Sequence, residues 1–106
     1  MKKILTLLFI SLMSFNVYAE SHTGKVSKIN LYGENWPNSH RGGILFKLEN
    51  MPSNANYFRI NKSDVAFNTF LSTLLSVKRA KATITVHYDI DDSRYKYAPV
   101  KAISIE

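Results

Sequence analysis

Three carboxylates stand close together near the C-terminal end of the chain, at Asp89, Asp91 and Asp92. Carboxylates at such spacing can share general acid and base work in an enzyme. These three, however, lie in the hydrophilic stretch DIDDSRYK, which is typical of a turn exposed to water. The sequence has neither a Ser–His–Asp pattern nor a phosphate-binding glycine loop. We therefore interpret the acidic cluster as a solvated turn and predict that the protein is not an enzyme.

Metal and disulfide chemistry is not indicated either. The three histidines, His22, His40 and His87, show no metal-ligand spacing with one another or with carboxylates. The chain has no cysteine, which excludes disulfides. We predict no metal and no cofactor.

Two aromatic residues are candidates for binding. Tyr88 ends the stretch ATITVHYD, in which Ile84 and Val86 predict the apolar face of a strand. It is either the edge of a core with its hydroxyl in water or part of a binding pocket. Trp36 stands with Arg41 in the polar loop ENWPNSHRGG, where it either packs on the domain or is exposed to stack on a ligand.

The elements that must position these residues can be read from the apolar pattern. Strands are expected over GKVSKINLYG, GILFKLE, YFRI, ATITVHYD and YAPVKAISIE. Ile44, Phe46 and Leu48 share one face of the second, and Phe58 and Ile60 one face of the third.

One helix is expected over SDVAFNTFLSTLLSVKRAK, capped by Ser63 or Asp64. Basic residues lie near its C-terminal end, where positive charge interacts favourably with the helix dipole. An apolar stripe is expected to face the core, and it comprises Phe67, Phe70, Leu71, Leu74 and Leu75. The opposite face is uncharged and comprises Asn68, Thr69, Ser72, Thr73 and Ser76. That face either meets water or presses against other helices.

The first and last strands switch their apolar face partway, which predicts that each one bends to serve two sheets or carries a bulge. In the first strand, Val26 lies on one face and Ile29 and Leu31 on the other. In the last strand, Val100 and Ala102 lie on one face and Ile103 and Ile105 on the other. With one helix between strands three and four, this order predicts an all-β fold with one helix, a five-stranded Greek-key barrel of the OB type. The alternative is an α+β sheet with one helix packed on it.

The N-terminal residues indicate export. Lys2 and Lys3 precede the short apolar run ILTLLFISLM, and VYA predicts a signal peptide over residues 1–19, cleaved after Ala19. No second long apolar run follows, so a secreted protein without membrane insertion is expected. Residues 20–106 are expected to form one OB-fold domain. A core this small, without disulfides, favours an oligomer.

Three segments, TGKVSKINL, FNTFLSTLLSVKRAKATITVHYD and PVKAISIE, resemble the B subunits of subtilase cytotoxin and typhoid toxin in their order and spacing. They cover about half of residues 20–106. The resemblance implies an OB-fold subunit that forms a homopentamer, binds host cell-surface glycans, some of them sialylated, and delivers a toxin A subunit.

By position, the family's sialic-acid pocket falls on Thr23 and Tyr88, with Thr23 in place of the usual serine. The loop that contains Trp36 and Arg41 adds candidates, because OB folds often use it for oligosaccharides. The chain departs from the family in having no cysteine, in the loop from Tyr32 to Gly43 and in lacking a tail beyond the last strand.

Two other functions compete with a glycan-binding toxin subunit. An exported OB domain for nucleic acid is favoured by the positive balance of residues 20–106, which keep 12 basic and 8 acidic side chains without Lys2 and Lys3, and by the aromatics. The basic residues are scattered, so we expect no nucleic-acid partner. A protein-binding module, such as an inhibitor, would be monomeric and indifferent to glycans.

Overall fold

The computed structural model describes residues 19–37 and 40–106. The signal-peptide prediction falls almost entirely on residues 1–18, which lie outside the described residues. The elements are the strands β1 (Ala19–Leu31), β2 (Ile44–Leu48) and β3 (Tyr57–Ile60), the helix α2 (Phe67–Ala80), and the strands β4 (Thr83–Asp89) and β5 (Tyr97–Ile105).

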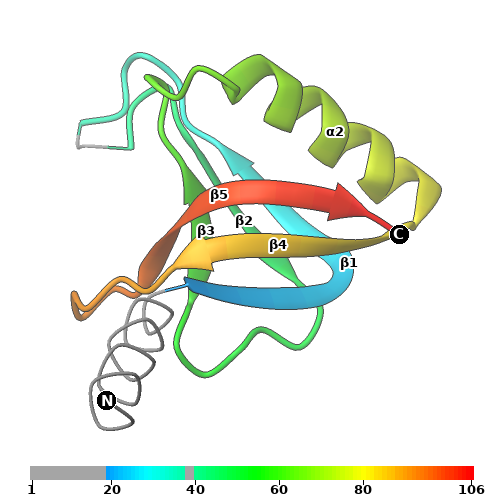
Figure 1. Cartoon of the computed structure of the whole chain (residues 1–106). Helices are drawn as coiled ribbons and strands as arrows, with labels where there is room; N and C mark the ends of the chain where they lie inside the picture. The colour runs from blue at the N-terminus through cyan, green and yellow to red at the C-terminus, as the bar shows by residue number, and fades with distance from the viewer. Residues whose placement is uncertain (1–18, 38–39) are drawn as a thin grey trace, which may run out of the picture.

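The strands close into a barrel in the order β1-β2-β3-β5-β4 (Figure 1). β3 and β5 pair in parallel, and the other neighbours pair antiparallel. The helix lies between β3 and β4 in the sequence. This is the OB-type barrel that the order of elements predicts, and the α+β alternative is wrong.

Both bent strands serve two partners, as their switching patterns predict. β1 pairs with β4 over residues 19–25 and with β2 from Val26 onward, with a register shift between Val26 and Lys28. β5 pairs with β3 and then with β4, with a second shift opposite His87 and Tyr88. These irregularities rotate the backbone, so a strand can present apolar side chains to the core along a curved path.

The core lies inside the barrel and is built by the inward residues of β2, β3 and β4. Phe46, Phe58, Ile84 and Val86 have no exposed surface, and Ile44, Leu48 and Ile60 are also buried. The expected inward faces of β2 and β3 are therefore confirmed. On β5 the pattern is only partly right, because Ala102 and Ile105 are exposed while Ile103 packs against the core.

The helix differs from its prediction at its start. α2 begins at Phe67 after Ala66, which provides no side-chain cap. Asp64 instead accepts a hydrogen bond from the Ala66 N–H at 2.8 Å and forms a turn before the helix. A carboxylate that bonds the backbone two residues on competes with helix formation. At the other end, Lys78 and Arg79 occupy the last turn and Lys81 adopts the left-handed conformation.

The apolar stripe of α2 is also narrower than expected. Leu74 and Val77 are buried, while Phe67, Phe70 and Leu71 are partly buried against the core. Leu75 is 49% exposed, so its assignment to the stripe was wrong. The uncharged face is exposed at Asn68, Thr69, Ser72 and Ser76.

Candidate functional site

Tyr88 is a core residue whose hydroxyl has a partner inside the protein. It points into the barrel from β4 and is 2% exposed. Its ring lies 5.0 Å from the ring of Phe58, and its hydroxyl donates a hydrogen bond to Asn54 Oδ1 at 2.8 Å. Burial raises the pKa of this hydroxyl, and the bond to Asn54 opposes that rise only in part. The hydroxyl is therefore neither in water nor presented to a ligand.

Thr23 lies within β1, which begins earlier than the sequence pattern indicated. It is exposed and pairs with Thr85, and its hydroxyl lies 2.8 Å from the Thr85 hydroxyl. Thr85 in turn donates to a carboxylate oxygen of Glu106 at 2.7 Å.

Thr23 and Tyr88 do not share a pocket. Successive strand residues point to opposite faces, so Thr85 points out of the barrel and Tyr88 points in. Thr23, on the rung opposite Thr85, lies on the outside. The barrel wall separates the two side chains that the resemblance places in one site.

Trp36 belongs to a continuous row of rings on the outside of the barrel. The ring centroids follow one another at 4.8 Å from Trp36 to Tyr32, 5.7 Å from Tyr32 to His40, and 5.2 Å from His40 to Tyr97. Tyr95 follows Tyr97 at 5.6 Å. We call these five residues the aromatic row. Trp36 is 42% and Tyr95 is 53% exposed, so both ends of the row meet solvent.

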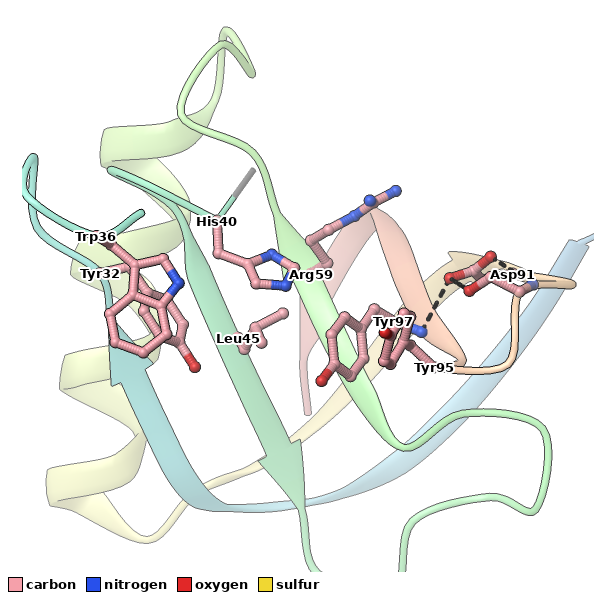
Figure 2. A pocket seen from close by; sticks show the side chains of 9 residues that line it. Tyr32, Trp36, His40, Leu45, Arg59, Asp91, Tyr95 and Tyr97 are labelled. Carbon is pink, nitrogen blue, oxygen red and sulfur yellow. Dashed lines mark hydrogen bonds between the residues drawn. The ribbon is translucent and has the colours of Figure 1, made fainter. Parts of the chain in front are cut away.

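The aromatic row lines a cavity of about 430 Å³, which we call the aromatic cavity. Figure 2 shows Trp36 and Tyr32 on one side and Tyr95, Tyr97 and Asp91 on the other. The remaining lining residues are Leu45, Arg59 and Ser93. Leu45 points away from the barrel interior yet is only 2% exposed. A buried leucine on an outer face indicates that the side chains around it form a built depression.

Backbone and side-chain hydrogen bonds hold the β1–β2 loop that carries Trp36. The Tyr32 N–H donates to the Gly43 carbonyl at 3.1 Å and the Gly43 N–H to the His40 carbonyl at 2.8 Å. Arg41 Nε donates to the Trp36 carbonyl at 3.0 Å. Arg41 therefore holds the backbone of Trp36, and it does not line the aromatic cavity.

Asp91 organises the opposite side, in the loop between β4 and β5. Its carboxylate accepts hydrogen bonds from the Ser93 N–H at 2.9 Å, the Ser93 hydroxyl at 2.8 Å and the Tyr97 N–H at 3.0 Å. The bond from the Ser93 backbone lowers the pKa of Asp91, and the other two bonds and Arg59 act in the same direction. An ionised carboxylate with these partners fixes the loop beside Tyr95 and Tyr97.

The cavity occupies the position at which an OB fold is built to bind. In this fold, the face of the second and third strands and the loops after the first and fourth strands form the usual ligand surface. Leu45 comes from β2, Arg59 from β3, Trp36 and His40 from the β1–β2 loop, and Asp91 from the β4–β5 loop.

Sequence reasoning identified Trp36 but missed Tyr32, Arg59, Tyr95 and Tyr97. The pair Tyr95 and Tyr97 follows the predicted turn, and OB folds use that turn together with the first loop. Tyrosines next to a turn that OB folds use for ligands were the sequence signal that could have identified these two residues. The approach of Tyr97 to His40, by contrast, depends on how the barrel closes.

Comparisons with known proteins identify no relative, since no family model matches the chain and neither a curated protein nor a solved structure matches it. Within the two described ranges, no group of three His, Asp or Glu side chains is placed to hold a metal ion. Among the same residues, no helix has the length and apolar character needed to cross a membrane.

Proposed function

We propose that the protein is a secreted glycan-binding domain that holds sugar rings against the aromatic row. The observation that carries this proposal is the aromatic row itself, which joins the two loops that OB folds use for ligands. The cavity volume of about 430 Å³ falls in the range of small-ligand sites.

The chemistry of a sugar matches this lining. A pyranose presents an apolar C–H face that packs on an aromatic ring, and Trp36 and Tyr95 are exposed enough to offer one. Its hydroxyls donate and accept hydrogen bonds. Arg59, Asp91 and Ser93 supply charged and polar groups within the same lining.

Single-stranded nucleic acid is less well supported. Binding of that kind combines stacking rings with a positively charged groove that follows several phosphates. Within the described lining of the aromatic cavity, the cation Arg59 is opposed by the anion Asp91. Nucleic-acid binding falls steeply with salt, while neutral-glycan binding changes little.

The resemblance to toxin B subunits extends this proposal to a homopentamer that delivers an A subunit to cells. The uncharged, exposed face of α2 supports helix–helix contacts in such a ring. One cavity would bind a glycan weakly, and five on one face would bind a cell surface more tightly by avidity. The sugar site proposed is the aromatic cavity, because Thr23 and Tyr88 do not share a pocket.

A glycan array tests the binding site. The wild type is expected to bind a subset of glycans, and Trp36→Ala is expected to lose about tenfold or more in affinity, on the scale of one aromatic contact. Ile105→Ala is the matched control, because Ile105 is a large apolar residue, 61% exposed on β5, that lies neither on α2 nor in the cavity lining. A wild type that binds no glycan, or a Trp36→Ala protein that binds as well as the control, would contradict the proposal.

Light scattering tests the assembly. The protein lacking residues 1–19 is expected to run at five times the mass of its chain. Ser72→Glu is expected to break that assembly, because it brings like charges together around a ring of helices. Lys78→Glu is not a suitable control, because Lys78 lies in the last turn of α2 and a negative charge there would also destabilise the helix terminus. Ser21→Glu on the exposed outside of β1 is the matched control. A monomeric wild type at micromolar concentration rejects the pentamer and leaves glycan binding open.

A further inference from the structure

A second cavity adjoins the aromatic cavity and has a different charge. It has a volume of about 500 Å³ and is lined by Arg41, Arg59, Asn61, Lys62 and Ser63. We call it the basic cavity. Its lining, within the described residues, contains three cations, an amide and a hydroxyl, and no carboxylate. Arg59 lines both cavities, so the two are contiguous through one side chain.

The cations of the basic cavity come from two stretches of the chain, the β1–β2 loop with Arg41 and residues 59–62 with Arg59 and Lys62. Arg41 is anchored through Nε to the Trp36 carbonyl at 3.0 Å, which leaves its terminal nitrogens for other partners. The aliphatic stem of Lys62 lies close to Gly42. If Gly42 were replaced by a residue with a side chain, its Cβ would lie 2.7 Å from Lys62 Cδ. The φ of +74° at Gly42 also favours glycine. Any larger residue at this position would displace Lys62.

Arg59 carries an unmet hydrogen-bond donor. Its Nε is buried and has no partner among the described residues. A buried donor without an acceptor costs free energy, and ligand or water oxygens are the usual partners for such groups. The unmet donor lies on the side chain that joins the two cavities.

The charge of this cluster is compensated only in part, at Arg59, whose guanidinium interacts with the Asp91 carboxylate on the side of the aromatic cavity. The ion pair found in the described part of the chain joins Lys101 to Asp89, and neither lines the basic cavity. Asp64, the acid nearest to it in the sequence, uses its Oδ1 on the Ala66 N–H. Asp91 lines the aromatic cavity and not the basic one.

From these observations we infer that the basic cavity is an anion subsite that takes a sulfate group on a glycan whose sugar ring lies on the aromatic row. This inference rests on the proposed function and names its ligand class as sulfated glycans. Guanidinium and ammonium groups form charge-assisted hydrogen bonds with oxyanions, Arg through a bidentate fork and Lys as a compact charge. Asn61 and Ser63 supply neutral donors beside them.

The two cavities divide the recognition between them. The aromatic cavity binds the apolar faces and hydroxyls of a sugar, and the basic cavity binds the charged substituent. Because Arg59 borders both, the substituent belongs to the sugar on the rings or to its immediate neighbour. A single-stranded nucleic acid could also pair stacked rings with an anion. It would need cations repeated along a groove, and the three seen here gather in one cavity.

The test uses calorimetry of the protein lacking residues 1–19 with three probes. These are a heparin-derived hexasaccharide, the same hexasaccharide after desulfation and re-N-acetylation, and an oligothymidylate of matched charge. The wild type is expected to bind the sulfated probe about tenfold or more tightly than the desulfated one, as a charge-assisted contact implies.

Lys62→Gln keeps the Cβ and Cγ methylenes near Gly42 and removes the charge, and it is expected to reduce the sulfate preference by about fivefold or more. Lys28→Gln is the matched control, because Lys28 is exposed on β1 outside both cavities. The control is expected to change affinity by less than about twofold, since it alters only net charge at a distance.

The outcomes separate the two proposals. Equal binding of both hexasaccharides with loss in Trp36→Ala overturns the sulfate subsite and leaves the glycan site standing. Equal losses in Lys62→Gln and Lys28→Gln assign the preference to net charge and also overturn the subsite. Tighter, Lys62-dependent binding of the oligothymidylate replaces it with a nucleic-acid site. No binding of either hexasaccharide overturns the sulfate subsite, while the glycan array decides the glycan site separately.

Discussion

Tyr88 and Trp36 are both aromatic residues that carry a polar atom, but one is buried in the barrel and the other is exposed on its outside. Tyr88 is 2% exposed, and its hydroxyl is used inside the protein by Asn54. Trp36 is 42% exposed, and its backbone makes the hydrogen bonds that hold it, through its N–H to the Gly33 carbonyl and its carbonyl from Arg41. The difference shows that residue type alone does not mark a binding site. The proposed site instead rests on an exposed ring whose backbone is fixed by hydrogen bonds.

The largest expected effect is a difference in the stability lost when Tyr88 and Trp36 are each replaced by alanine. Tyr88→Ala leaves a cavity beside Phe58 and is expected to reduce the free energy of unfolding by about 3–5 kcal/mol. Trp36→Ala, at a half-exposed position in a loop, is expected to cost about 1 kcal/mol or less. Chemical denaturation of both variants measures this. Equal losses would show that Trp36 is a structural residue and would remove the contrast.

Tyr88→Phe isolates the hydroxyl. It removes the donor to Asn54 while keeping the ring, and a loss of about 0.5–1.5 kcal/mol in the free energy of unfolding is expected. Glycan binding is expected to stay unchanged, because Tyr88 lines neither cavity. Reduced glycan binding by a protein of wild-type stability would return Tyr88 to the site.

The raised pKa of Tyr88 adds a pH dependence with a definite sign. The folded state holds this phenol proton more tightly than the unfolded chain, whose tyrosines titrate near about 10. The stabilisation is therefore complete below about pH 10 and is lost as the pH rises above it. Because other tyrosines titrate as well, the measurement is the difference between wild type and Tyr88→Phe, which is expected to shrink at alkaline pH.

Asp91→Asn tests the opposite side of the aromatic cavity. The amide cannot accept all three hydrogen bonds that the carboxylate receives from Ser93 and Tyr97, and a stability loss of about 1 kcal/mol is expected after solvent screening. Glycan affinity is expected to fall as well, because the loop positions Tyr95 and Tyr97.

The pH dependence of Asp91 has the opposite sign to that of Tyr88. Its pKa is lower in the folded protein, so its contribution is present above the unfolded value of about 3.9 and is lost as the pH falls through the folded pKa. Wild type and Asp91→Asn are expected to converge in stability in acid. A stability difference that is the same at pH 7 and pH 2 would show that the carboxylate charge is not the cause.

Thr23→Val has the smallest expected effect. It removes a hydroxyl on the exposed outside of β1 and breaks one contact with Thr85, and a change of less than about 0.5 kcal/mol in stability is expected. Glycan binding is expected to match the wild type. A glycan array on which Thr23→Val loses binding would place a sugar on the outer face of β1 and β4, away from the aromatic cavity.

Local pattern was enough for much of the fold. The alternation in β2, β3 and β4 predicted which side chains point inward, because the strand period of two is set by the backbone itself. The switches of face in β1 and β5 predicted their bends for the same reason. The start of α2 was missed because the Asp64 carboxylate bonds the backbone of the preceding turn.

The candidate site was recovered only in part. Trp36 was recognisable as an aromatic residue in a loop that OB folds use, whereas Tyr88 and Thr23 were paired by resemblance. One residue of register decides the side of the wall on which a strand residue lies. The pairing of Thr23 with Thr85 therefore separates the two side chains, and no spacing along the chain reveals that register.

The sequence by itself determined the class of fold and the residues of the core, because apolar periodicity is a local property that burial must satisfy. It did not determine which rings meet. Tyr32 and His40 belong to the β1–β2 loop and Tyr97 begins β5, and His40 meets Tyr97 only because β3 pairs in parallel with β5 as the barrel closes. Arg59 borders both cavities because it stands on β3, between loop residues that come from separate parts of the sequence. Contacts of this kind depend on closure of the barrel, and closure is a property of the tertiary structure.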